Sequence, residues 1–215
     1  VSQLIYQKEI VKQKGMIAEL LQKQKNLENK IRLNQKKITA FDKEIQRLIR
    51  LAIDNANKKT SAPSNFKFSI TPEAQIVGKS FYANKGKLPW PVEQGIVIQN
   101  FGTQIHPVVR TTKIKSNGII IATTQTADAR AIFKGVVMTI LSYKGSNPTV
   151  LVQHGNYITA YTNLESVYVT KGQNLSSKEK IGKVFTNPQT GKTELKFSIF
   201  QSSTPLNPKS WIYML

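Results

Sequence analysis

The sequence contains few side chains that could hold a metal ion or act as a nucleophile. Its 215 residues include two histidines, His106 and His154, and no cysteine. The absence of cysteine excludes disulfides, thiolate zinc ligands and thiol catalysis. The histidines lie far apart, in Ile-His-Pro and Gln-His-Gly-Asn, and no acidic residue near either one completes a recognisable site. We therefore expect both histidines to be structural or to lie at the rim of a site, and we expect no histidine-built metal centre.

The composition is strongly basic. Lys and Arg number 31 against 12 Asp and Glu, which gives a formal net charge of +19 and a pI near 10.1. Such a charge favours anionic partners, namely nucleic acid, membrane surfaces, cell-wall polymers or acidic proteins. The basic residues are dispersed and form no recognised nucleic-acid motif, so we expect no nucleic-acid binding. No apolar run approaches the ~18 residues of a membrane span, and no signal-peptide pattern follows Val1.

Residues 1–60 are predicted to form one long helix with a coiled-coil seam. Apolar side chains recur on a seven-residue register, and no proline precedes Pro63. Such a helix cannot bury its own seam, so it needs a partner helix from an upstream segment or from a second chain. The two series of the register are Ile10, Ile17, Ile31, Ile38, Ile45 and Ala52, and Leu20, Leu27, Phe41 and Leu48.

Residues 61–87 are predicted to be a linker followed by a short amphipathic helix over 71–84. Small polar residues around Pro63 break the heptads. Thr71 is a typical N-cap, and Pro72 suits the first helical position. The apolar residues of this helix, spaced about three to four apart, include Ile76, Val77, Phe81 and Tyr82.

From residue 88 onward the pattern becomes that of β strands. Runs of β-branched and aromatic residues alternate with Gly, Pro and Asn turns at short intervals. We expect an antiparallel β domain over 88–215, and the fold class is therefore α+β. The main runs begin at Gly95, Gly118, Ala131, Thr149, Tyr157 and Leu195.

A series of short segments in this β domain follows a known family pattern in both order and spacing. They include Leu88-Pro-Trp-Pro-Val, Asn100-Phe-Gly, Ser116-Asn-Gly-Ile-Ile-Ile-Ala, His154-Gly-Asn-Tyr-Ile-Thr-Ala-Tyr and Thr193-Glu-Leu-Lys-Phe-Ser-Ile. With them, residues 70–215 resemble the LytM (lysostaphin-type) peptidoglycan endopeptidases, and most closely their branch of EnvC-type murein hydrolase activators. The resemblance implies an antiparallel β fold of the duplicated-hybrid-motif kind, and the upstream coiled coil fits the same branch.

The resemblance also implies that, at five positions that are catalytic in active members, this sequence carries other residues. Active members hold zinc with an H-x-x-x-D motif and the second His of an H-x-H motif, and a Y-x-H motif supplies another histidine. The H-x-x-x-D positions are Ser116 and Ile120 here, and the H-x-H positions are Glu194 and Lys196. Asn163, beside Tyr161, replaces the histidine of Y-x-H. We refer to these five positions as the former site.

The residues at the former site argue against zinc chemistry. Ile120 has no donor atom, and the Lys196 ammonium would place a positive charge where the metal cation should lie. Without zinc, the pKa of a water molecule stays far above neutral, and no imidazole is present to act as a general base. Glu194 is expected to pair with a lysine or to face solvent. We therefore expect no peptidase activity and no cofactor.

Basic residues around the former site suggest a partner-binding groove. The alternative is that they are ordinary solvated surface charges, and the residue pattern does not favour either interpretation. The predicted groove residues are Arg110, Lys113, Lys115, Tyr161, Asn163 and Lys196.

The resemblance implies a periplasmic, non-enzymatic protein of cell division. Such proteins bind and activate peptidoglycan (N-acetylmuramyl-L-alanine) amidases through the degenerate domain, and their coiled coil engages the FtsEX membrane complex. The helix over 71–84 is then expected to cover and restrain the groove with Ile76, Phe81 and their neighbours. Two alternatives remain open: a passive peptidoglycan-binding module and, less favoured, an endopeptidase with a rearranged site.

Overall fold

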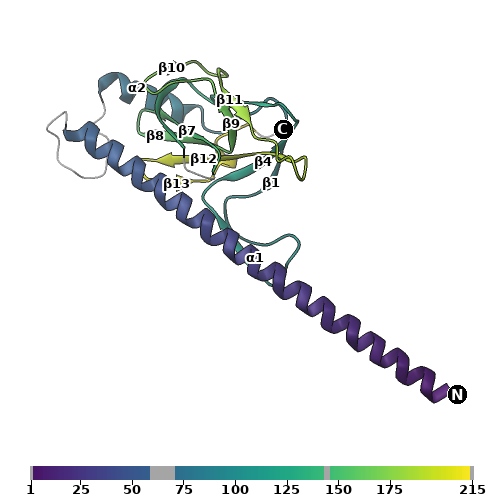
Figure 1. The fold of residues 1–215 in the computed structure, drawn as a ribbon. Helices are drawn as coiled ribbons and strands as arrows, with labels where there is room; N and C mark the ends of the chain where they lie inside the picture. The colour runs from purple at the N-terminus through teal and green to yellow at the C-terminus, as the bar shows by residue number, and fades with distance from the viewer. Residues whose placement is uncertain (1, 59–70, 143–145, 214–215) are drawn as a thin grey trace. The chain divides into compact units, whose positions relative to one another are not determined.

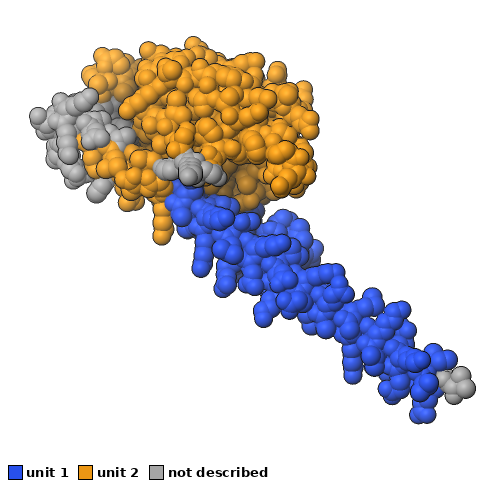
Figure 2. Space-filling view, in the orientation of Figure 1, with its two compact units in different colours: residues 1–42, 103–115 blue, residues 43–102, 116–215 orange. Residues whose placement is uncertain are grey.

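The computed structural model describes residues 2–58, 71–142 and 146–213 (Figure 1). The chain forms two compact units, which Figure 2 colours separately. The first comprises residues 1–42 and 103–115, and the second comprises residues 43–102 and 116–215. The long helix and the β region therefore both contribute to each unit, whereas the sequence pattern divides the chain near residues 60 and 87.

The helices and strands follow one another along the chain as the sequence pattern suggests, with additional short strands. In chain order they are α1 (Ser2–Lys58), α2 (Pro72–Ala83), β1 (Ile96–Gln99), β2 (Gly102–Ile105), β3 (Lys113–Ser116), β4 (Ile119–Thr123), β5 (Asp128–Arg130), β6 (Gly135–Leu141), β7 (Thr149–His154), β8 (Tyr157–Thr162), β9 (Leu164–Val167), β10 (Asn174–Leu175), β11 (Lys180–Val184), β12 (Thr193–Gln201), β13 (Thr204–Leu206) and the 3₁₀ helix η1 (Pro208–Ser210).

Helix α1 is 57 residues long, in agreement with the helix predicted over 1–60. In its first half the apolar side chains of the heptad register face solvent, with exposed fractions of 44% for Ile10, 56% for Ile17 and 62% for Leu20. The partner helix that would cover them stays a prediction. Among the described residues, neither α1 nor any other helix has the length and apolar character needed to cross a bilayer.

Within the first unit, the hairpin formed by β2 and β3 contacts α1 through two hydrogen bonds, one from its loop and one to β3. The Thr111 hydroxyl donates to the Glu28 carboxylate at 2.7 Å, and the Gln35 side-chain amide donates to the Lys115 carbonyl at 2.7 Å. The bond from Thr111 is also the main reason why the pKa of Glu28 is lowered from its ordinary value. These bonds tie the hairpin to one side of the helix.

Two members of the heptad register lie on this same side of α1. Ile31 and Ile38 follow Glu28 and Gln35 by three residues each, and residues three apart are neighbours on a helix surface. Both isoleucines are half-buried. This part of the seam is therefore covered by the hairpin of the same chain, where the heptad pattern predicts a partner helix.

The second unit contains the expected antiparallel β domain. Its large sheet has the strand order β1-β4-β12-β8-β7-β6-β10, with β13 paired to β12, and a smaller sheet has the order β5-β11-β9. A single apolar core joins residues of the large sheet, such as Ile121 and Phe197, to residues of the small sheet, such as Ile181 and Val184. The core lies between the two sheets, on one face of the large sheet. The opposite face of the large sheet points away from this core.

One strand begins later than its apolar pattern predicts. The run starting at Ala131 reads as a strand, but β6 begins at Gly135. The Ala131 backbone instead pairs with a turn, since its carbonyl accepts from the Lys178 N–H at 2.7 Å and its N–H donates to the Glu179 carbonyl at 2.8 Å. Ala131 is fully buried all the same. The apolar run thus reflects burial in the core, and its first residues form a loop.

Candidate functional site

Side chains along β12 alternate between two environments. Leu195 and Phe197 are fully buried in the core, whereas Glu194 and Lys196 are half-buried on the opposite side of the sheet. This alternation follows from the two-residue period of a strand. We call the side away from the core the outer face; near the former site it carries Ile120, Ala122, Glu194 and Lys196.

The strand register brings three positions of the former site together. Lys196 stands directly opposite Ile120 of β4 on one side and Thr162 of β8 on the other. Glu194 stands opposite Ala122 of β4. Residues directly opposite in an antiparallel pair have Cβ atoms about 4.5–5.5 Å apart. Ile120, Glu194 and Lys196 therefore share one small area of the outer face.

Asn163 ties this area to the end of β8. Its backbone has a φ of 78°, in the left-handed region that asparagine tolerates better than most residues. The side-chain amide donates to the Glu194 carbonyl at 2.7 Å, and its oxygen accepts from the Asn147 amide at 2.6 Å. Both ends of the Asn163 side chain are thus used to hold the backbone of β12 and the segment before β7.

Ser116 is enclosed at the end of β3. It is 2% exposed, and its hydroxyl donates to the Gly118 carbonyl at 2.8 Å while accepting from the Gly118 N–H at 3.3 Å. A Cβ at Gly118 would overlap the Ser198 hydroxyl and the Phe197 carbonyl, so only glycine fits there. The Ser116 hydroxyl is therefore a turn-forming group whose hydrogen-bonding capacity is largely used.

The stretch that contains all five positions matches a known family. Residues 114–208 match the model of Peptidase family M23. They form an M23 peptidase-like domain. No curated protein matches the sequence.

Solved structures share the fold of this M23 peptidase-like domain. Csd3 from Helicobacter pylori is 21% identical with a TM-score of 0.50, over 61% of this chain and 36% of Csd3. A zinc containing peptidase from Vibrio cholerae is 22% identical with a TM-score of 0.50, over 60% of this chain and 41% of that one. A chain of the SpoIIQ–SpoIIIAH pore forming complex is 22% identical with a TM-score of 0.52, over 60% and 92% of the two chains. The chain thus spans less than half of the first two proteins.

The residues at the former site do not fit a catalytic zinc ion, which needs three nitrogen, oxygen or sulfur donors and an open position. Ile120 supplies no donor, and the Lys196 ammonium stands directly opposite it. The Ser116 hydroxyl is already bonded to Gly118. Across the described ranges, no three His, Cys, Asp or Glu side chains gather closely enough to hold a metal ion. The M23 peptidase-like domain therefore lacks the ligand set that zinc chemistry requires at these positions.

The structure divides the six residues predicted to line a partner-binding groove. Arg110, Lys113 and Lys115 belong to the first compact unit and are exposed. Asn163 and Lys196 belong to the second unit and are half-buried. A groove that uses all of these side chains together stays a prediction.

The expectation that Tyr161 lines this groove is wrong. Its side chain is 0% exposed, because it lies on the core side of β8. The hydroxyl accepts from the Ile132 N–H at 3.0 Å and from the Thr159 hydroxyl at 3.4 Å. Burial raises the pKa of Tyr161 to about 12. The ring therefore fills the core, and its hydroxyl satisfies a buried backbone donor that would otherwise be unpaired.

Sequence reasoning missed two exposed isoleucines that extend the outer face. Strand β1 pairs with β4 and places Ile96 opposite Ala122. Ile96 and Ile98 are 69% and 47% exposed, whereas Val97 between them packs against the core. The run Ile96-Val97-Ile98 is apolar at every position, so the sequence does not show which of its two sides faces the core. The former site is thus bordered by an exposed apolar strip.

Helix α2 is anchored by one aromatic side chain. Thr71 caps it by accepting from the Ala74 N–H at 3.3 Å. Phe81 is 0% exposed and stacks on His154 and Tyr157, with ring centroids 4.9 and 5.0 Å away. These two residues lie on either side of the turn between β7 and β8. Helix α2 therefore packs on that turn.

This position contradicts the expectation that α2 covers the former site. The turn lies at the beginning of β8, and Asn163 follows the end of this strand, roughly 20 Å from Tyr157 at the usual rise of a strand. Ile76 is 63% exposed and Tyr82 is 58% exposed, while Val77 is half-buried. Phe81 points into the aromatic cluster. The groove-facing role predicted for Ile76 and Phe81 is therefore wrong.

The last turns of α1 cover another part of the outer face. Along β8 and β12 the outer-face residues Ile158, Ala160 and Phe200 are at most 2% exposed. The apolar stripe of α1 in the same unit, also buried to within a few per cent, consists of Ile45, Ile49 and Ile53. The Gln46 amide donates to the Ser203 carbonyl at 3.4 Å, which places the helix at the turn between β12 and β13 (Figure 1). These turns of α1 therefore cover the outer face near the start of β8, and Lys196 of the former site lies toward the other end of the same strand pair.

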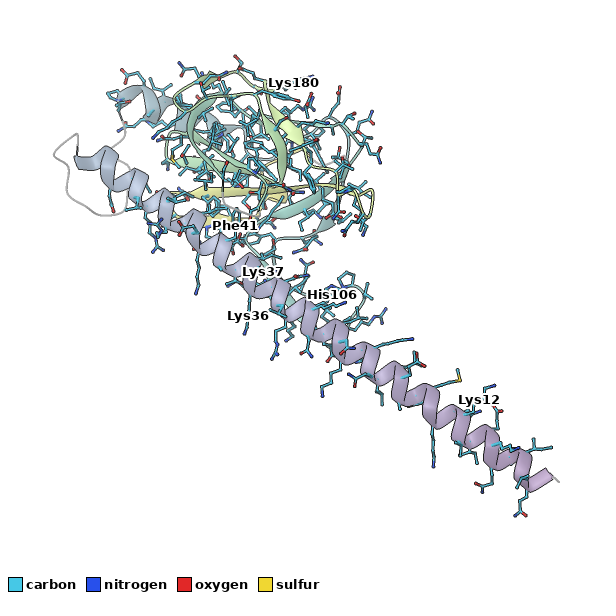
Figure 3. The ribbon with its side chains drawn as sticks, viewed as in Figure 1. Lys12, Lys36, Lys37, Phe41, His106 and Lys180 are labelled. Carbon is cyan, nitrogen blue, oxygen red and sulfur yellow. The ribbon has the colours of Figure 1, made fainter. Side chains whose placement is uncertain are left out.

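Both histidines have structural contacts. His154 is fully buried, with Nδ1 2.8 Å from the Lys134 carbonyl and Nε2 2.9 Å from the Thr159 hydroxyl, and burial lowers its pKa to about 4. His106, labelled in Figure 3, accepts at Nδ1 from the N–H groups of Val108 and Val109 at 3.2 and 3.1 Å. His154 therefore links buried polar groups in the core, and His106 stabilises a turn of the backbone.

Proposed function

We propose that this protein is a non-catalytic member of the M23 peptidase-like group that binds and activates peptidoglycan amidases. The observation that carries the proposal is the pairing of Ile120 with Lys196 across β4 and β12. It replaces two positions of a metal ligand set with an apolar side chain and an ammonium group. The domain retains its fold while losing the chemistry, which is typical of a hydrolase domain reused for binding.

The surface around the former site supports a docking role. Ile96 and Ile98 expose an apolar strip at the edge of the outer face, and Lys196 lies on the same face two strands away. Exposed apolar patches rimmed by polar residues are typical of interaction sites. An amphipathic segment of an amidase, with apolar side chains toward the strip and a carboxylate toward Lys196, matches this surface in chemistry.

Control by the N-terminal helix is part of the same proposal. The stripe Ile45, Ile49 and Ile53 covers the outer face next to the former site, so access to the full face requires these turns of α1 to move. A ligand or force that favours the open arrangement would then increase activation. By resemblance, the protein acts in the periplasm during cell separation, and the exposed part of α1 engages a membrane complex of the FtsEX type.

A dye-release assay on purified peptidoglycan tests the proposal. It compares this protein alone, a periplasmic amidase alone and the mixture, each with and without zinc or a chelator. The expected result is release above the amidase's own level only in the mixture. The variant Lys196→Glu should weaken activation, whereas Lys171→Glu, at an exposed lysine in the turn between β9 and β10, should not. Release by this protein alone that a chelator abolishes would overturn the proposal.

Direct binding to peptidoglycan is the second candidate function. The net charge of +19 favours attraction to an anionic cell-wall polymer. Co-sedimentation with purified sacculi in the absence of amidase tests it. Binding that disappears at high salt, without any effect on amidase activity, would favour the passive module over the activator.

A further inference from the structure

A polar cavity opens on the second compact unit, apart from the former site. Its volume is about 370 Å³, within the usual range for small-ligand pockets. Three separate stretches of chain form its walls, and the side chain of Lys180 at its rim is labelled in Figure 3. The lining residues are Glu93, Gln94, Thr124, Gln125, Thr126, Ala127, Asp128, Arg130, Lys178 and Lys180.

Backbone hydrogen bonds hold the walls of this cavity in place. The Ala127 N–H donates to the Thr124 carbonyl at 3.2 Å and closes one turn. The Lys178 N–H donates to the Ala131 carbonyl at 2.7 Å, which ties the opposite turn to the core segment before β6. A cavity with fixed walls binds its ligand without an added cost of ordering loops.

Two residues of the lining have a strained backbone. Thr126 has a φ of 65° and Lys178 has a φ of 67°, in the left-handed region. A β-branched residue such as threonine is a genuine outlier there. Strain of this kind is unfavourable and persists only where the surrounding structure imposes it. Both strained residues face the same cavity, from two different turns.

The charges of the lining do not cancel. Lys180 and Asp128 form an ion pair at 2.7 Å, and Asp128 also accepts from the Tyr168 hydroxyl at 3.0 Å. The salt bridges among the described residues include neither Lys178 nor Glu93. The pKa of Lys180 is raised mainly by Asp128 and also by the charge of Glu93. The Arg130 Nε donates to the Trp90 carbonyl at 3.1 Å, which fixes the plane of its guanidinium group.

We propose that this cavity binds the terminal carboxylate of a short peptide. Arg130 and Lys178 together supply two positive charges for the carboxylate, and a guanidinium held in one plane suits a carboxylate well. Glu93 can accept from an N–H of the peptide, and the amides of Gln94 and Gln125 can bond its backbone. The lining thus matches a ligand that carries one negative charge next to amide groups. The proposal does not depend on amidase activation, because the cavity and the former site share no residue.

Calorimetric titration of the full chain with two matched peptides tests this assignment. The probes are N-acetyl-alanyl-alanine and its C-terminal amide, which differ only in the terminal charge. The acid is expected to bind saturably, and the amide about tenfold more weakly or worse, since the neutral amide forms no charge-assisted pair with the guanidinium and ammonium groups. Equal binding of the two probes, or binding of neither at millimolar concentration, would overturn the proposal.

Variants of the lining separate this site from general attraction to a basic protein. Lys178→Asn removes the charge and keeps a residue that tolerates positive φ, so the fold should be retained. It should weaken binding of the acid about tenfold. Lys171→Asn removes an exposed lysine outside the cavity and should leave binding unchanged. If the two variants lose affinity equally, the attraction is non-specific and the assignment is wrong; circular dichroism of each variant checks the fold.

Discussion

The ring of Phe81 stacks on the imidazole of His154, with centroids 4.9 Å apart and planes inclined by 14°. Both side chains are fully buried, and the pair joins α2 to the last residue of β7. Trp211 extends the cluster from the C-terminal segment, with its centroid 5.1 Å from that of Phe81. The amphipathic helix is thus held as part of the core of the β domain.

Replacing Phe81 should destabilise the β domain strongly. Phe81→Ala leaves a cavity among His154, Tyr157 and Trp211, and large-to-small changes of this kind cost about 3–5 kcal/mol. Ile76→Ala on the same helix is the control, since Ile76 is 63% exposed and its loss should change stability by about 0.5 kcal/mol or less. Urea unfolding measures both, and equal effects would contradict the anchoring role.

Stability should fall with pH as His154 becomes protonated in the unfolded chain. Burial lowers the pKa of His154 from 6.5 to about 4 in the folded protein, so the folded state binds this proton less readily. The contribution is complete above pH ~6.5 and is lost as the pH falls toward ~4, by on the order of 3 kcal/mol. The variant His154→Gln should lack this part of the pH dependence. Parallel curves of unfolding free energy against pH for the two proteins would refute the assignment.

Two glycines should respond in opposite directions to the same substitution. Gly118→Ala brings a methyl group against Ser198 and the Phe197 carbonyl, so we expect a loss of at least ~2 kcal/mol. Gly15→Ala meets no atom within 4 Å on an exposed helix and should stabilise that helix by about 0.5–1 kcal/mol. Thermal melts of each variant, followed by circular dichroism, distinguish them, and a stable Gly118→Ala protein would contradict the close packing of the turn before β4 against β12.

A charge in the buried stripe of α1 should release its last turns. Ile49→Asp places a carboxylate at a fully buried position, whereas Arg50→Asp changes the neighbouring exposed one. Amide hydrogen exchange over residues 43–58 should accelerate in the first variant only. If α1 restrains the outer face as proposed, the same variant should also increase amidase-dependent dye release. Unchanged exchange in Ile49→Asp would show that the stripe does not hold the helix.

Zinc should leave the stability of the protein unchanged. A ligand present at 100 times its Kd stabilises the folded state by about 2.7 kcal/mol, which a thermal melt resolves easily. Neither added zinc nor a chelator should shift Tm, since the former site lacks a ligand set. The triple variant Ser116→His, Ile120→Asp, Lys196→His restores donor atoms and is the positive comparison. A zinc-dependent Tm in the unmodified protein would mean that a metal site exists elsewhere in the chain.

Local patterns were sufficient to predict several features from the sequence alone. The heptads predict α1, the Thr71 cap and Pro72 predict the start of α2, and β-branched runs predict the main strands. Each depends on residues close together in the chain, where backbone geometry links spacing to structure directly. The lack of zinc donors at Ile120 and Lys196 also follows from residue type, because no arrangement gives an isoleucine a donor atom.

Contacts between distant segments were decided only by the tertiary structure. An apolar stripe shows that a helix face needs cover, but it does not show whether a partner helix, a hairpin or a sheet supplies it. The hairpin that bonds Gln35, the turn that holds Phe81 and the core side of Tyr161 all depend on residues far away in the chain. Alternation in a strand likewise defines two faces without showing which one is the core. The sequence by itself determined which elements form and what chemistry is absent, whereas long-range packing decided what covers each face.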